Sequence, residues 1–207
     1  MANVSLPHDA KAGPTKREVR AVLLDALELD ETDHFVEVGS CTGAVTVQAA
    51  RRAGRVTALE RKPERLEITR KNLAANDTTA DVALRNAEAP TGLPEDADAL
   101  FLGGSRNYDA VLEYAVDAGV DRVVMNVSRL EVAGAATRAF RDRDLLEDVR
   151  QFQVSRGYEL AGATSFDADN PVYMLVGGTD DAATDGGNPR AATDDGRRPG
   201  ATGGGSR

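Results

Sequence analysis

An apolar strand that leads into a glycine loop and then into a small-residue helix is the feature that most constrains this chain. The stretch HFVEVGSCTGAVTVQAA covers residues 34–50 and places Gly39 and Gly43 in the turn. In open α/β sheets, such a turn lies at the carboxyl ends of the strands, where ligands bind. The stretch therefore predicts an α/β domain with a cofactor-binding loop, although a purely structural turn remains an alternative.

Strand and helix patterns alternate along most of the chain. Predicted strands cover residues 34–38, 55–60, 81–85, 97–104 and 121–128, and predicted helices follow Gly43 and cover 63–76, 107–119 and 130–143. Repeated strand–helix pairs of this length predict a doubly wound, mostly parallel sheet. The last two predicted strands, 148–160 and 170–178, have no helix between them, which predicts a C-terminal antiparallel hairpin at the sheet edge.

The two ends of the chain differ from its middle. Residues 1–14 are polar and contain Pro and Gly, so they are interpreted as an N-terminal arm. Thr15 and Glu18 match a Thr-x-x-Glu capping box just before an apolar run, which predicts the first helix. Residues 179–207 contain no Leu, Ile, Val or aromatic residue. Such a segment buries too little surface to offset its ordering entropy, which predicts a disordered acidic, Gly-rich tail.

Composition excludes several classes of protein. The 207 residues fit one domain with tails, and aromatic residues are only 4%, so Val, Leu and Ala must build the core. A net charge of −9 disfavours nonspecific binding to nucleic acid or to an anionic membrane. Only four residues are Lys, which suggests a high-salt (halophilic) cytoplasm, although a high-GC genome gives the same bias.

Cysteine usage and hydropathy indicate a cytoplasmic protein without a metal. Cys41 is the only cysteine, so the chain has neither an internal disulfide nor a thiolate metal site. No apolar run approaches the roughly 20 residues that span a bilayer. The first residues lack the apolar core of a secretion signal. We therefore expect a soluble cytoplasmic protein.

Two cofactor patterns compete for the glycine loop. The dinucleotide pattern G-x-G-x-x-G/A would use Gly39, Cys41 and Ala44, and its middle glycine is missing. The pattern acidic-x-G-x-G-x-G would use Glu37, Gly39 and Gly43, and Cys41 again replaces the middle glycine. No Lys-Ser/Thr pair follows, so the loop is not a Walker A site.

A second acid favours the methyl-donor pattern. Glu60 ends the second strand, where a carboxylate accepts the two ribose hydroxyls of an adenosine and repels a 2′-phosphate. S-adenosylmethionine carries a sulfonium cation and no phosphate, so acidic residues suit it better than they suit a dinucleotide. A nicotinamide cofactor and a structural turn remain alternatives, and Cys41 is interpreted as a small loop residue rather than a catalytic thiol.

Several separate stretches point beyond the loop to one family. They lie within residues 7–177 and read GPTKREVRA, EVGSCTGAVT, VTALERKPERLEITRKNL, RNAEAP, DALFLGGS, VSRGYELAG and NPVY. Together they resemble the decarboxylating precorrin-6B and cobalt-precorrin-6B C15-methyltransferases of cobalamin biosynthesis. The Gly-Pro-Thr, Gly-Gly-Ser and Asn-Pro-Val elements are the specific part, because the loop and the acid after it are common to methyltransferases.

This resemblance implies a class I fold over residues 15–178 that binds S-adenosylmethionine and an acidic tetrapyrrole. The cofactor residues that it implies are Thr15, Gly39, Ser40, Cys41, Thr42, Gly43, Glu60 and Ala87. Gly103, Gly104 and Ser105 would lie beside the donor, and Arg106, Arg129 and Arg156 would pair with substrate carboxylates. The family also implies a homo-oligomer, a tetramer. No catalytic residue is singled out, because a sulfonium methyl is already activated and alignment is the main requirement.

The chain departs from the family pattern at three places. Cys41 replaces a glycine, Asn86 replaces an Asp that would contact adenine, and Arg106 with Asn107 replaces glycines. Asn170 and Pro171 resemble an N-methyltransferase motif, but that motif follows the fourth strand whereas Asn170 opens the last one, so they are interpreted as a strand-entry turn. A methyltransferase for another acceptor, such as a protein carboxylate or RNA, remains an alternative. A nicotinamide-dependent oxidoreductase or a nonenzymatic nucleotide-binding module remains another.

Overall fold

The structure is a computed structural model that describes residues 4–10 and 15–179. Gly13 and Pro14 of the Gly-Pro-Thr element lie outside the described residues. The predicted tail lies outside them as well from residue 180 onward.

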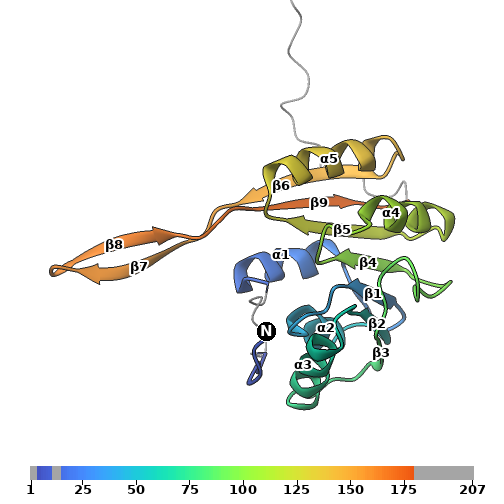
Figure 1. The fold of residues 1–207 in the computed structure, drawn as a ribbon, viewed down its shortest axis with the longest axis horizontal. Helices are drawn as coiled ribbons and strands as arrows, with labels where there is room; N and C mark the ends of the chain where they lie inside the picture. Colours follow the sequence, from blue (N-terminus) through green and yellow to red (C-terminus); the bar gives the residue numbers. More distant parts are fainter. Residues whose placement is uncertain (1–3, 11–14, 180–207) are drawn as a thin grey trace, which may run out of the picture.

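A seven-stranded sheet forms the centre of the molecule (Figure 1). Its strands are β1 (His34–Val38), β2 (Arg55–Leu59), β3 (Asp81–Arg85), β4 (Ala99–Leu102), β5 (Arg122–Val127), β6 (Leu146–Phe152) and β9 (Val172–Gly177). The order is β3-β2-β1-β4-β5-β9-β6, and β9 runs antiparallel to both of its neighbours. The doubly wound, mostly parallel sheet is thus confirmed. The final antiparallel pair is also present, with apolar β9 inside the sheet and charged β6 at the edge.

Helices cover both faces of the sheet. The helices α1 (Arg17–Ala26), α2 (Ala44–Ala49) and α3 (Pro63–Ala74) lie on one face, and α4 (Tyr108–Asp117) and α5 (Leu130–Arg141) lie on the other (Figure 1). Alternate residues of β4 show the division, because Phe101 packs with α1 and α2 whereas Leu100 and Leu102 pack with α4 and α5. Within the described residues, no helix has the length and apolar character needed to cross a membrane.

The first helix begins near its predicted position but without the predicted cap. α1 starts at Arg17, with Lys16 at the N-cap and no side-chain hydrogen bond to the helix end, so the capping box is wrong. Glu18 instead pairs with Arg156, at 3.3 Å between carboxylate and guanidinium. The Thr15 carbonyl accepts a hydrogen bond of 2.6 Å from Arg20, which ties the residues before α1 to the helix.

A two-stranded arm extends away from the sheet at the C-terminal hairpin (Figure 1). The predicted strand 148–160 is divided into β6 and β7 (Ser155–Leu160), and the predicted loop after it contains β8 (Ala163–Ala168). Three large apolar side chains on the arm are exposed, Tyr158 by 47%, Leu160 by 57% and Phe166 by 69%. The sequence pattern did not distinguish this arm from a longer edge strand, because both are extended and partly apolar.

Candidate active site

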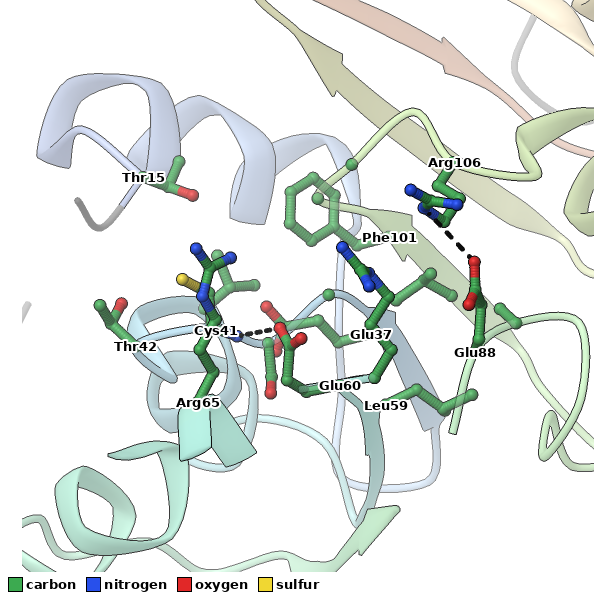
Figure 2. A pocket seen from close by; sticks show the side chains of 18 of the residues that line it. Thr15, Glu37, Cys41, Thr42, Leu59, Glu60, Arg65, Glu88, Phe101 and Arg106 are labelled. Carbon is green, nitrogen blue, oxygen red and sulfur yellow. Dashed lines mark hydrogen bonds and ion pairs between the residues drawn. The ribbon is translucent and has the colours of Figure 1, made fainter. Parts of the chain in front are cut away.

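A pocket of about 380 Å³ opens at the carboxyl ends of β1, β2 and β4 (Figure 2). It brings together most of the residues singled out in the sequence: Thr15, Gly39, Ser40, Cys41, Thr42, Glu60, Ala87, Gly103, Gly104, Ser105 and Arg106. Gly43 is the N-cap of α2, at the end of the same loop. Arg129 and Arg156 do not line the pocket, since Arg129 is the N-cap of α5 and Arg156 pairs with Glu18 and Asp169.

The loop between β1 and α2 uses left-handed backbone at three positions. Gly39 and Gly43 have φ angles of 91° and 76°, which glycine adopts without a steric cost. A Cβ on Gly43 would lie 3.1 Å from the Thr69 side chain and 3.3 Å from its Cα, so α3 packs directly against the loop. Cys41 has a φ of 53°, so the residue that departs from the family pattern still takes a backbone conformation typical of glycine.

Two buried side chains of α3 hold this loop in shape. The Ser40 and Thr69 hydroxyls are 2.9 Å apart, and the Thr69 hydroxyl also donates to the Cys41 carbonyl at 3.0 Å. Asn72 donates to the Thr42 carbonyl at 2.8 Å. The loop carbonyls are therefore occupied by protein donors before any ligand binds, which predicts a preformed site. Sequence patterns did not single out this support, because the partners lie 28 to 30 residues apart in the chain.

Glu60 closes the pocket beside the loop. Its carboxylate accepts a hydrogen bond from the backbone N–H of Cys41 at 3.3 Å (Figure 2). It also accepts one from the backbone N–H of Lys62 at 2.9 Å. Each carboxylate oxygen retains further acceptor capacity, which suits a pair of ribose hydroxyls. Asn86 donates to the Glu60 carbonyl at 2.8 Å, a bond that an ionised Asp could not make. The Asn86 side chain thus fixes the end of β2 in this chain.

Glu37 lies beside Glu60 at the end of β1 and is almost fully buried. The Thr46 hydroxyl of α2 donates to its carboxylate at 2.5 Å. The pKa of Glu37 is raised to about 7, chiefly by burial and also by the nearby Glu60, although the Thr46 hydrogen bond lowers it. This side of the pocket is therefore suited to a ligand that carries positive charge.

Cationic residues lie around the rest of the pocket. Arg106 pairs with Glu88 at 3.4 Å, and Arg65 reaches from α3 toward Cys41 (Figure 2). Arg61 also lines the pocket, and its place directly after Glu60 in the sequence is the signal that could identify it. Burial raises the pKa of the Cys41 thiol, which agrees with a structural role rather than a nucleophilic one. Among the described residues, no cluster of His, Cys, Asp and Glu is arranged to hold a metal ion.

The sheet order, the glycine loop and the acid that ends β2 define a class I methyltransferase that uses S-adenosylmethionine. The sequence profile of the precorrin methyltransferase domain matches residues 7–177. The chain belongs to this family of precorrin methyltransferases.

Similar proteins agree with this family assignment. A relative from Halobacterium salinarum is 76% identical over 86% of this chain and 95% of its own length, and is named a probable cobalt-precorrin-6B C(15)-methyltransferase (decarboxylating). A relative from Methanosarcina acetivorans with the same name is 35% identical and covers 80% of this chain and 93% of its own.

Solved structures show the same similarity. A precorrin 8W decarboxylase from Methanobacterium thermoautotrophicum matches with a TM-score of 0.74 and 30% identity, over 86% of this chain and 96% of its own. A precorrin-6y C5,15-methyltransferase from Geobacter metallireducens matches with a TM-score of 0.75 and 30% identity, over 83% and 94%.

The affinity for S-adenosylmethionine should rise with pH through about 7, the pKa of Glu37. The cationic donor favours the ionised carboxylate, so we expect roughly tenfold tighter binding at pH 8 than at pH 6. Calorimetry at constant salt measures this dependence, and the Glu37→Gln variant should lose it. An equal pH dependence in the variant would contradict the role of Glu37.

The free energy of unfolding of the ligand-free protein should change with pH in the opposite direction and fall as the pH rises. The folded-state pKa of Glu37 is raised from its usual 4.5, so the folded protein holds this proton more tightly than the unfolded chain does. This contribution to stability is present below about pH 4.5 and is lost as the pH rises toward 7.

Proposed function

We propose that this protein methylates C15 of precorrin-6B or its cobalt form, using S-adenosylmethionine, with loss of CO₂ from the C12 acetate. One observation carries the proposal: a single pocket joins the donor loop and Glu60 to the Gly103–Arg106 segment. The printed name of the Halobacterium salinarum relative, at 76% identity, supports the acceptor and the decarboxylation.

The residues of the chain would bind and align rather than perform acid–base chemistry. S-adenosylmethionine supplies an already activated methyl group. Glu60 would hold the ribose, and the loop would hold the methionine portion against Glu37. A Cβ on Gly104 would meet nothing within 4 Å, so the end of β4 leaves room for the acceptor beside the donor. Arg106 would exchange Glu88 for a carboxylate of the acceptor at the mouth of the pocket.

A coupled assay tests this function. The purified protein would be incubated in high salt with S-adenosylmethionine and with precorrin-6B or its cobalt form, and formation of S-adenosylhomocysteine would be followed. The proposal expects product only when the tetrapyrrole is present. Equal product with RNA or a protein carboxylate would indicate another acceptor. A tightly bound nicotinamide cofactor in the purified protein would instead favour an oxidoreductase.

Further features belong to the same proposal. We propose one methyltransferase domain over residues 15–178 and a salt-rich cytoplasm as its location. The net charge of −9 and the similarity to a Halobacterium salinarum protein support that location. The same charge argues against nucleic acid or a membrane as a partner.

The exposed arm supports the proposed homo-oligomer. In β7 and β8, Tyr158 and Leu160 are exposed on one face and Phe166 on the other, because cross-strand partners share a face. The arm is a sheet of two strands only, and unpaired strand edges with apolar side chains are a surface on which copies of a chain associate. A tetramer is the assembly that the family resemblance suggests.

Removing these apolar side chains should dissociate the oligomer. We expect the Tyr158→Ser/Phe166→Ser variant to sediment as a monomer while it binds S-adenosylmethionine with unchanged affinity. The matched control is Val116→Ser on α4, which removes an apolar side chain of similar exposure (41%) and should leave the mass unchanged. A wild-type monomer in high salt, or an arm variant with the wild-type mass, would contradict this assembly.

A further inference from the structure

Asn126 on β5 has a buried amide without a protein partner. Its side-chain oxygen and nitrogen are both buried, and within the described residues they are the only buried side-chain N or O atoms that lack a hydrogen bond. An unpaired buried amide destabilises the folded state, because it has lost its hydrogen bonds to water without gaining others. An unpaired polar side chain at a buried position therefore indicates that its hydrogen-bond partner is a ligand rather than another residue of the chain.

The register of the sheet places Asn126 next to the pocket. Val124 packs on the α1 face of the sheet together with Phe101 and Met174, and Asn126 points to the same face because side chains alternate along a strand. The register pairs Leu102 with Met125, so Gly103 lies opposite Asn126 in the next pair.

Two glycines pack closely together in this row, since a Cβ on Gly103 would lie 3.2 Å from the Gly39 carbonyl oxygen and 3.3 Å from the Phe101 ring. A Cβ on Gly39 would lie 3.8 Å from the Gly103 carbonyl carbon, and both glycines line the pocket. Asn126 does not itself line the pocket, but it is the next side chain in the row, directly behind the lining residue Gly103. On the other side it pairs with Met174, which offers no strong hydrogen-bonding group.

We infer that Asn126 is an acceptor-binding residue, whose amide N–H donates to a carboxylate of the tetrapyrrole next to the transferred methyl group. This inference rests on the proposed function. The acceptor carries acetate and propionate groups, which only accept hydrogen bonds when ionised, and the amide nitrogen supplies two donors. The donor nucleoside would be bound by the loop and by Glu60, so we assign the unpaired amide to the second substrate.

The test compares Asn126→Leu with Asn126→Asp. The Leu variant should bind S-adenosylmethionine within twofold of wild type and lose about tenfold or more in kcat/KM for the tetrapyrrole. Its unfolding midpoint should equal or exceed that of wild type, because an unpaired buried amide has been removed. The Asp variant should lose more activity than the Leu variant, since it repels a carboxylate.

The control is Met174→Leu, which changes packing beside Asn126 without removing a hydrogen-bonding group and should keep kcat/KM within about threefold. Wild-type kcat/KM in Asn126→Leu, or an active Asp variant, would overturn the inference. The unfolding midpoint is a readout that does not need the acceptor. Failure of the wild-type protein to methylate the tetrapyrrole would count against the proposed function instead, so the two failures are distinguishable.

Discussion

Calorimetry on the Glu60→Ala variant should show S-adenosylmethionine binding weakened by about 100-fold or more. The carboxylate would lose its hydrogen bonds to two ribose hydroxyls, and hydrogen bonds to a charged group contribute about 1.5–3 kcal/mol each. Two such bonds amount to at least about 3 kcal/mol, which corresponds to about 100-fold in the dissociation constant. The variant also loses the acceptor for the Cys41 N–H, so the loop should become less ordered.

The matched control for this variant is Glu88→Gln. Glu88 also lines the pocket, but it is partly exposed and pairs with Arg106 at the mouth rather than with the loop. We expect its affinity for S-adenosylmethionine to stay within about threefold of wild type, because exposed ion pairs contribute little. Wild-type affinity in Glu60→Ala would show that the ribose is held elsewhere.

The Asn72→Leu variant should lose both stability and cofactor affinity. Asn72 is fully buried, donates to the carbonyls of His8 and Thr42 at 2.8 Å, and accepts from the His8 N–H at 3.0 Å. Because these backbone groups are left unpaired, the free energy of unfolding should fall by about 3 kcal/mol, which corresponds to roughly 6–12 °C in Tm. Release of the Thr42 carbonyl should also weaken S-adenosylmethionine binding by about tenfold, because the loop is no longer held in shape.

Asn76, two residues beyond the end of α3, provides the control for these measurements. It makes similar reciprocal hydrogen bonds, to the N–H and carbonyl of Ser5, at 3.0 and 2.7 Å. Its other hydrogen bonds go to Arg51 and to the Asn72 carbonyl rather than to the glycine loop. Asn76→Leu should therefore lower Tm by a smaller amount and leave cofactor affinity within about threefold. Equal losses of affinity in the two variants would contradict a specific link between Asn72 and the loop.

Local patterns predicted the parts of the structure that depend on local physics. Apolar runs followed by helical periodicity identify β1, β2, β4 and β5, because strands buried on both faces are nearly continuous in apolar residues. The turn at Gly39 and Gly43 could be predicted because positive φ angles favour glycine. Glu60 could be predicted because its place at the end of the second strand follows from the fold.

Features that depend on tertiary neighbours were not predicted. The capping box at Thr15 failed because Glu18 pairs with Arg156, a residue 138 positions away. The hydrogen bonds of Thr69 and Asn72 to the loop need the packing of α3 on α2, which no short pattern encodes. The arm of β7 and β8 extends from the sheet without packing onto its core, so hydrophobic periodicity gave no signal for it.

The proposed methylation is tested most directly by mass spectrometry of the tetrapyrrole after reaction with S-adenosylmethionine that carries a ¹³C-labelled methyl group. We expect a single product that has gained one labelled methyl group at C15 and has lost one CO₂. An unchanged tetrapyrrole, with the label transferred to RNA or protein under the same conditions, would contradict it.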